Sequence, residues 1–258
     1  MKRKHIAVLF FLVSLMATSC SKVDALFNNG EPITEQRSIS QPFDVICMHD
    51  NINVELVHSS HPRLELTCPK NLIDNIITET QGDSLIIWND NSYNWLRSFD
   101  YSIDLTVYYD SLREINYCSN GRLHSSDTLL GRIVLDTLGD YGRHCFMLRI
   151  LEGCGDIDLT FNCDVMRNRF FNGTSCITLH GEAGYSEYIL RAYGTVNSLD
   201  LNTNIVNVLS ESTNDLYLLM RNGGSLTARL YSIGNVYYKG NPWLSKECHG
   251  DGQVIKIE

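Results

Sequence analysis

Residues 139–240 repeat one short unit, a Gly, Asn or Asp turn followed by an alternating strand. The copies are GDIDL at 155–159, GTSCITL at 173–179, GTV at 194–196, NDLYL at 214–218 and GNVYY at 234–238. Their turns lie 18, 21, 20 and 20 residues apart. A near-constant period of this kind is typical of stacked repeats, in which each unit buries its apolar face only against its neighbours. The stretch therefore predicts a β-solenoid.

Alternating apolar residues extend this pattern toward both ends of the chain. Val45 and Cys47 follow Phe43 with a spacing of two, and the alternation returns around Leu105 and near the C-terminus at 254–257. Such spacing puts one face of a strand in a core and the other in water. Residues 71–80 fit either a helix or a strand. A two-sheet sandwich is the competing fold, although it usually has longer strands and no constant period.

The first twenty residues have the form of an export signal. Three basic residues at 2–4 precede an apolar run at 6–16, and small residues lead to Cys20. The run is too short to span a bilayer as a mature helix. Ala17-Thr18-Ser19-Cys20 looks like a bacterial lipobox of a loose, Bacteroidetes-type form, in which the Cys is lipidated and begins the mature chain. We therefore expect a signal peptide at 1–19 and membrane attachment through a lipid on Cys20, with an ordinary secretory signal as the alternative.

Polar residues follow, so we expect a flexible tether over 20–41 and one domain over 42–258. The 258 residues carry a formal charge of −9, and loss of the signal leaves 18 basic against 30 acidic residues, or −12. Nucleic acid is an unfavourable partner for such a chain because phosphate binding needs a basic face.

Eight cysteines remain after Cys20, an even number that permits disulfides in an exported protein. No pair has the C-x-x-C spacing of a zinc or redox site. The sequence is compatible with two alternatives, buried free thiols or at least one disulfide.

The chain end carries more specific segments, with GNVYYKGNP at 234–242 and GDGQV at 250–254. With FDVI at 43–46 and INVEL at 52–56, they resemble the putative auto-transporter adhesin, head-GIN domain family (DUF2807), over about residues 42–258. The resemblance implies an all-β fold, a right-handed parallel β-helix, in an exported and often lipid-anchored protein. It supplies no catalytic residues. Residues 117–120 and 211–214 replace glycine pairs of the family pattern, but Asn also suits such turns.

No residue pattern specifies chemistry, so we expect no cofactor, no metal and no catalytic residue. His58 and His61 share a loop, and this pair is more readily explained as two solvated side chains than as a metal site. Parallel β-helices also host polysaccharide lyases and hydrolases, which makes a carbohydrate-active enzyme the alternative function. Its carboxylates would have to converge from successive coils. The candidates are Asp136, Asp156 and Asp158, with Arg149 or Arg167 near them, although Asp is also a common turn residue.

The preferred hypothesis is a non-catalytic, lipid-anchored protein of the cell envelope, at the periplasmic face or the surface of the outer membrane, that binds a glycan or a protein. Exposed aromatic residues are the candidates for its contact surface: Tyr93, Trp95, Phe99, Tyr217 and Tyr237. Residues 241–244 are expected to cover the C-terminal end, because a stacked sheet that stops abruptly leaves strand edges unpaired.

Overall fold

The computed structural model describes residues 28–92, 100–133 and 142–258, and this part of the chain is all-β as expected. Apart from the short 3-10 helix η1 (Ile73–Asn75), its regular elements are strands. No helix in the described ranges is long and apolar enough to cross a membrane. The strands are β1 (Pro32–Ser38), β2 (Val45–Asp50), β3 (Asn53–His58), β4 (Arg63–Pro69), β5 (Ile76–Gln81), β6 (Ser84–Asn89), β7 (Asp104–Tyr109), β8 (Glu114–Ser119), β9 (Leu123–Ser125), β10 (Arg132–Ile133), β11 (His144–Gly153), β12 (Ile157–Phe170), β13 (Ile177–Leu190), β14 (Val196–Ser210), β15 (Leu216–Leu230), β16 (Val236–Lys239), β17 (Trp243–Cys248) and β18 (Val254–Lys256).

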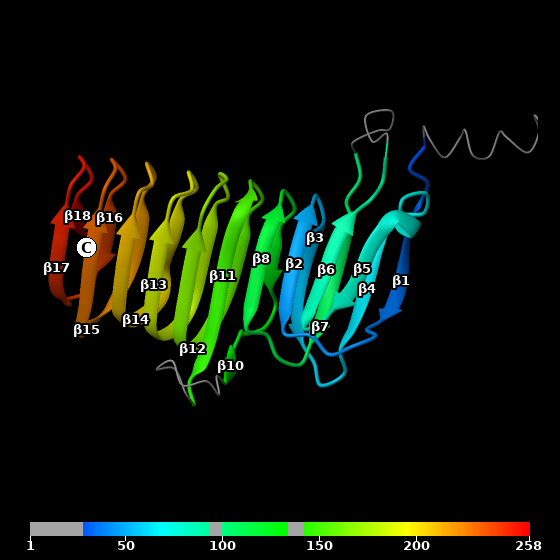
Figure 1. Cartoon of the computed structure of the whole chain (residues 1–258), viewed down its shortest axis with the longest axis horizontal. Helices are drawn as coiled ribbons and strands as arrows, with labels where there is room; N and C mark the ends of the chain where they lie inside the picture. The colour runs from blue at the N-terminus through cyan, green and yellow to red at the C-terminus, as the bar shows by residue number, and fades with distance from the viewer. Residues whose placement is uncertain (1–27, 93–99, 134–141) are drawn as a thin grey trace, which may run out of the picture.

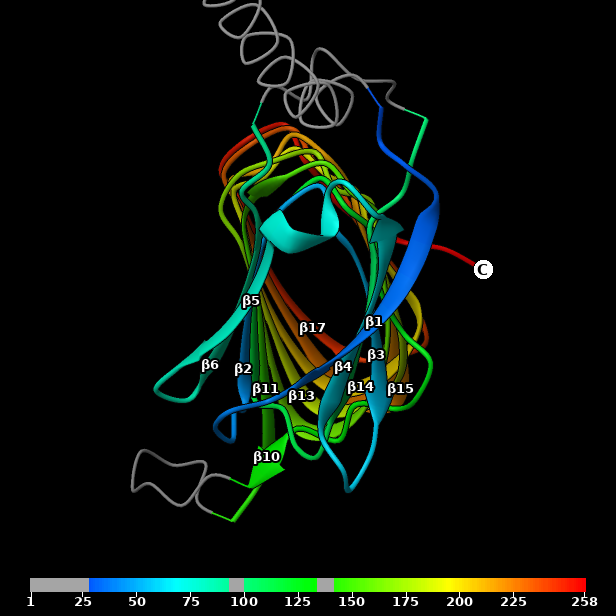
Figure 2. The same cartoon turned by 90° about the vertical axis from the view of Figure 1, so that its right-hand side faces the viewer.

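All of these strands belong to one continuous sheet, which curls around an apolar interior. Figure 1 shows the strands side by side in a row, and the end-on view in Figure 2 shows two walls that meet along a rounded edge. Strand β12 joins the walls, since its first residues pair with β9 and its second half pairs with β11. The strands from β12 to β15 are therefore long because each follows one wall, bends and returns along the other.

The repeat in the sequence corresponds to the register of this sheet. Ile157 pairs with Ile177 and Val165 with Tyr185, so β12 and β13 are parallel and offset by one repeat. Leu216 pairs with Val236 in the same way. Parallel pairing at an offset close to one repeat, with local register shifts in β13–β14 and β14–β15, places equivalent residues of successive units in columns, which explains the spacing of the turns.

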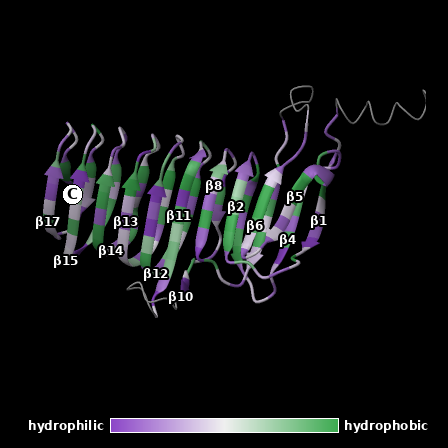
Figure 3. Cartoon of the chain, in the orientation of Figure 1, coloured by the Kyte–Doolittle hydropathy of each residue, from purple (hydrophilic) through white to green (hydrophobic). Residues whose placement is uncertain are grey.

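The side chains alternate between the interior and the solvent along each wall. Figure 3 shows this as alternating hydrophobic and hydrophilic bands on the strands. Leu159, Leu179 and Leu218 are buried, and the rings of Phe146 and Phe161 pack with their centroids 5.0 Å apart. Burial of about 1.5–3 kcal/mol per large apolar side chain is the main stabilising term for such a core.

The tight turns between the walls approach one another so closely that some positions accept only glycine. A Cβ on Gly194 would overlap the carbonyl oxygen of Ser175 in the preceding turn, and one on Gly173 would overlap that of Gly153. Gly173 also has a φ of +101°, in the left-handed region that favours glycine. The glycines of the repeat are thus required by backbone packing.

The N-terminal part departs from the simple repeat. Strand β2 pairs with β8 at an offset of 69 residues, as in Val45 with Glu114. The offset is this large because residues 63–112 form an insertion between the first unit of the stack and the next. This insertion adds antiparallel pairs, β1 with β4, β4 with β7 and β5 with β6. The insertion covers the N-terminal end of the row of strands. The near-constant spacing of turns along the sequence is therefore absent from this part of the chain.

Two expectations change in this region. Residues 32–38 were expected within a flexible tether, but they form β1, which pairs along its whole length with β4. Residues 71–80, which fitted either a helix or a strand, form η1 and then most of β5. The β-branched isoleucines at 76 and 77 favour the extended form.

The alternative of at least one disulfide is not found. All eight cysteines that follow Cys20 lie within the described ranges, and none of them is part of a disulfide. Cys163 is buried, and burial raises the pKa of its thiol to about 12. A thiol held neutral in this way is a packing group with little reactivity.

The C-terminal end was expected to be covered by residues 241–244, but Trp243 and Leu244 begin β17, which extends the sheet. Trp243 is 79% exposed, so it covers nothing. The end is protected in another way. The register places Lys246 beside the buried Ala228, and Lys256 beside Tyr238, at positions of the interior face. Inward-pointing charges on a last strand discourage another sheet from stacking on it.

Truncation after Gly240 is expected to make the protein associate. It removes β17 and β18 with both inward lysines and exposes the apolar edges of β15 and β16. Size-exclusion chromatography of the truncated and full chains would show larger species for the truncated chain. A truncated chain that stays monomeric would contradict this role for the last two strands.

Candidate functional site

The predicted contact residues fall into two groups. Tyr93, Trp95 and Phe99, like the lipidation candidate Cys20, lie outside the described residues. Tyr217 and Tyr237 lie on the outer face of neighbouring strands, β15 and β16, where they pair in register. The structure therefore brings together two of the five aromatic residues.

The two tyrosines stack on each other. Their ring centroids are 5.0 Å apart with an interplanar angle of 12°. Loss of solvent contact raises the pKa of the Tyr217 hydroxyl, and the carboxylate of Asp215 adds to this shift. Asn235 donates from Nδ2 to the Tyr237 hydroxyl at 3.4 Å and to Asp215 Oδ1 at 3.2 Å. Each ring thus uses one face for its neighbour, and a ligand would meet the edges and hydroxyls of the pair.

A larger feature lies at the opposite end of the row, where the chain outside the repeat forms a cleft of about 510 Å³. Four connections and β10 contribute to its walls, which combine carboxylates, an arginine, hydroxyls and apolar surface. The lining residues are Ile39, Ser40, Gln41, Pro42, Phe43, Asp44, Ser60, Pro62, Asp83, Asp110, Ser111 and Arg132.

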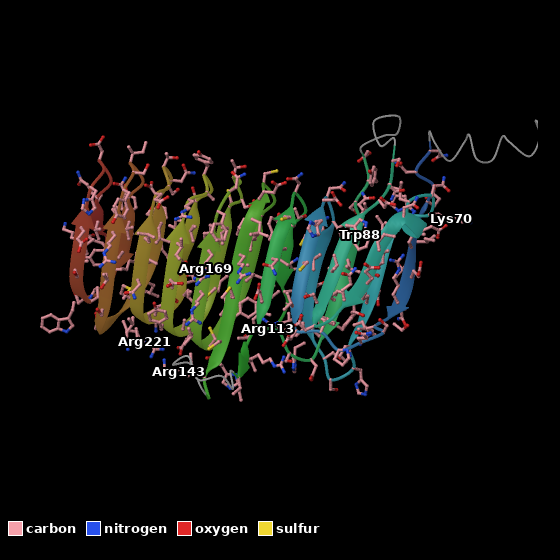
Figure 4. All side chains as sticks on the ribbon, viewed as in Figure 1. Lys70, Trp88, Arg113, Arg143, Arg169 and Arg221 are labelled. Atoms are coloured by element: carbon pink, nitrogen blue, oxygen red, sulfur yellow. The ribbon has the colours of Figure 1, made fainter. Side chains whose placement is uncertain are left out.

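Arg113 organises the charges at the base of the cleft, and Figure 4 labels it near the start of β8. Its Nε lies 3.0 Å from Asp44 Oδ1, its Nη2 contacts Asp83 and its Nη1 lies 3.5 Å from Glu114. Arg132 contacts the other oxygen of Asp44. The Asp44 side chain is only 4% exposed, so its charge is balanced by arginine in place of water.

The same cluster continues onto the neighbouring strand. Arg149 Nη1 lies 3.0 Å from Glu114 Oε1. Main-chain bonds hold the parts together, with Asp44 N donating to Asp83 O at 3.0 Å and Arg113 N donating to Asp44 O at 2.8 Å. The base of the cleft is therefore rigid, because side-chain and main-chain contacts tie the same three segments.

The cleft contains acidic side chains, the residue type on which a glycosidase depends. Three aspartates line the cleft, at positions 44, 83 and 110. A glycosidase needs one carboxyl group whose pKa is raised so that it can donate a proton. Here the bond from Arg113 lowers the pKa of Asp83, and Asp44 is held between two arginines. Asp83 is thereby favoured as a carboxylate.

The acidic residues first considered for catalysis are elsewhere. Asp136 lies outside the described residues, and Asp156 is exposed at a turn. Asp158 Oδ1 lies 3.1 Å from His180 Nε2, and Asp200 Oδ2 lies 3.4 Å from Nδ1 of the same ring. These pairs lie on the outer face of the sheet, apart from the cleft.

The histidine loop shows ordinary side-chain contacts. The His58 ring meets Tyr109 edge-on with centroids 5.7 Å apart, and His61 Nδ1 lies 3.0 Å from Ser60 Oγ. Within the described ranges, no three His, Cys, Asp or Glu side chains are placed to hold a metal ion.

The cleft was not predicted from the sequence. Its residues come from five separate positions between 39 and 132, and they meet only because the insertion folds back against β2 and β3. A signal does exist in hindsight, since the region that breaks the constant spacing of the repeat is the region that forms the cleft.

Asp83 should make a modest, acid-sensitive contribution to stability. Its pKa in the folded state is lowered by Arg113, so this contribution is present above the ordinary pKa of a carboxyl group, near 4, and is lost as pH falls through the lowered value. Because Asp83 is largely exposed, we expect Asp83→Asn to flatten the pH dependence of unfolding only slightly between pH 7 and 3. Asp110→Asn, on the same cleft, is the control, and an equal flattening in both variants would contradict the role of Arg113.

Comparison with known proteins places the chain in a family. The model of the putative auto-transporter adhesin, head GIN domain (DUF2807) matches residues 42–242. The chain belongs to this family. No sequence among curated proteins matches significantly.

Solved structures share the fold of this head GIN domain protein. A putative adhesin of Bacteroides fragilis superposes with a TM-score of 0.77 at 19% identity, over 90% of this chain and 100% of the other. A putative lipid binding protein of Parabacteroides distasonis gives 0.59 at 18% identity, over 90% and 99%. A putative adhesin of Parabacteroides merdae gives 0.55 at 17%, over 90% and 98%. At these identities the likeness establishes the fold alone.

Proposed function

We propose that this protein is a non-catalytic binding module of the cell envelope, anchored by a lipid on Cys20, whose ligand enters the cleft at the N-terminal end of the row. The observation that carries the proposal is the cleft itself, with a rigid charged base and a rim of hydroxyl and apolar groups. Pockets that combine apolar surface with a few fixed polar groups are typical ligand sites. Membership of an adhesin family supports a surface or envelope role.

The chemistry of the lining favours a glycan over an apolar ligand. Ser40, Ser60 and Ser111 offer hydroxyl groups, and Asp110 offers an exposed carboxylate to the hydroxyls of a sugar. Phe43 and the prolines supply apolar surface for the faces of sugar rings. A protein ligand with a basic side chain is the other candidate. Tyr217 and Tyr237 are proposed as a second contact surface.

A glycan array with the purified protein tests this proposal, and binding should fall in the double variant Asp110→Ala, Ser111→Ala. Glu247→Ala is the matched control, because this exposed acidic residue on β17 lies far along the row from the cleft and outside both proposed contact surfaces. Failure of the protein to bind any glycan or envelope protein would overturn the proposal. Cleavage of a glycan by the protein would favour the alternative, a polysaccharide lyase or hydrolase that uses the aspartates of the cleft.

Cys20→Ala is expected to release the protein from membranes. The lipobox-like segment before Cys20 supports lipidation, and acyl chains would then be the attachment to the outer membrane. Fractionation of cells that carry the wild-type or the variant chain measures the effect. Unchanged membrane association of the variant would contradict the anchor.

We also infer that the curled sheet is a right-handed parallel β-helix with coils of about one repeat. Parallel pairing at an offset close to one repeat from β12 to β16 supports this description, with register shifts inside the β13–β14 and β14–β15 pairs. The passage of β12 from one wall to the other supports it as well.

A further inference from the structure

Five of the eleven large apolar side chains that are exposed in the described chain lie along one edge of the molecule. We call this the turn edge, the tight turns at 151–156, 171–176, 191–195, 211–215 and 231–235 that connect the two walls. It forms the upper edge of the row in Figure 1. Five large apolar side chains of the described chain are exposed there, with exposures of 39–58%: Leu151, Phe171, Tyr193, Tyr231 and Ile233.

Main-chain bonds between turns hold these residues in line. Phe171 N donates to Ile150 O at 2.8 Å, and Tyr231 N donates to Ser210 O at 2.8 Å, so each turn is bonded to the end of a neighbouring strand. The ring of Tyr231 also stacks on His249 with a centroid distance of 4.9 Å. The turns are thus held in line, and four of the five carry exposed apolar side chains, the exception being the polar turn at 211–215.

The described chain begins on the same side as the turn edge. Strand β1 starts there and runs away from it, as Figures 1 and 2 both show. Asn71 N donates to Asn29 O at 3.1 Å, which fixes this first segment beside η1. From Cys20 to Asn28 the chain spans at most about 30 Å when fully extended. A lipid on Cys20 would therefore keep this end of the molecule close to the membrane.

We propose that the turn edge lies against the phospholipid surface, with its aromatic and aliphatic side chains in the headgroup region. This inference rests on the proposed lipid anchor. Tyrosine suits the membrane interface because its ring is apolar and its hydroxyl group can form hydrogen bonds with water or headgroups. Phenylalanine contributes apolar surface only. Apolar surface buried beside the lipid adds to the free energy of membrane binding.

The same orientation makes the cleft accessible. Arg132 of the cleft lies on β10, which both views place at the edge opposite the tight turns. A molecule that rests on its turn edge directs the cleft away from the membrane, where a ligand can enter.

The charge of the edge determines which lipid it accepts. Glu152, Asp156 and Asp215 are acidic, whereas Arg191 is paired with Glu211 at 3.1 Å. Acidic side chains repel anionic headgroups at short range, so the edge should prefer a zwitterionic surface. We therefore specify phosphatidylcholine vesicles as the probe.

Photocrosslinking of the full lipidated protein tests the orientation. Tyr193 or Tyr231 is replaced by photoreactive benzoylphenylalanine, and Ile205, exposed on the outer face of β14, is the matched control. After irradiation in phosphatidylcholine vesicles, we expect several-fold more lipid adduct at 193 and 231 than at 205. Added anionic lipid should lower the adduct at both positions.

The outcomes separate this inference from the anchor. Equal adducts at all three positions, or protein adducts in place of lipid adducts at 193 and 231, would overturn the membrane orientation even if Cys20→Ala releases the protein. If Cys20→Ala fails to release it, the anchor is wrong, and lipid adducts at 193 and 231 would then show that the edge binds without it. A variant that combines Phe171→Ser, Tyr193→Ser and Tyr231→Ser should dissociate from vesicles several-fold faster than Ile205→Ser.

Discussion

Gly194→Ala is expected to lower the free energy of unfolding by about 3 kcal/mol, although alanine is ordinarily a mild replacement for glycine. The added Cβ would overlap the carbonyl oxygen of Ser175 in the preceding turn. The turn cannot simply move away. Tyr193 N donates to Gly173 O at 2.8 Å, and Ile177 N donates to Thr195 O at 3.0 Å, so main-chain bonds on both sides fix the distance.

Gly184→Ala is the control for this effect. Its Cβ would lie 2.8 Å from Asp164 O, a milder conflict at the bend between the walls, and its φ, like that of Gly194, lies outside the left-handed region. Both variants lose the same unfolded-state freedom. Denaturant unfolding of the two variants and the wild type measures the difference. Equal small losses would contradict close packing of the turns as the reason for glycine at 194.

The repeat was predictable because two independent signals agree along it. Turn residues fix where each strand ends, and alternation fixes which face is buried, so the turns at 155, 173, 194, 214 and 234 define the stacked region. Both signals are local in the sequence. The all-β class followed from them, whereas the resemblance to the family came from the specific segments at 43–46, 52–56 and 234–254, and the family match confirms it.

What could not be predicted depends on contacts between distant residues. Strand β1 lies in a polar segment, and only pairing with β4 makes it a strand. Asn168 stands between two arginines in a polar run, yet its side chain is fully buried on the inner face of β12. The cleft needs the 69-residue offset between β2 and β8, a register that no local pattern contains.

Arg113→Met is expected to lower the free energy of unfolding by about 2–4 kcal/mol. The substitution keeps most of the apolar stem and removes the charge that faces Asp44, Asp83 and Glu114. Asp44 is almost fully buried, so the loss of an ion-pair partner leaves its carboxylate poorly compensated, which is costly even though Arg132 remains. The cleft should loosen as well, because Arg113 connects β2, the turn at Asp83 and β8.

Arg229→Met provides the matched control, since it removes the same group from a pair at the surface. Arg229 Nε lies 3.3 Å from Glu247 Oε2, and both side chains are more than half exposed. Exposed pairs of this kind contribute about 0–1 kcal/mol. Denaturant unfolding at pH 7 should therefore separate the two variants clearly. If both lose the same small amount, the buried charge of Asp44 is not held by Arg113. If Arg113→Met alone is destabilised and also loses ligand, the base of the cleft is a structural requirement for the proposed site.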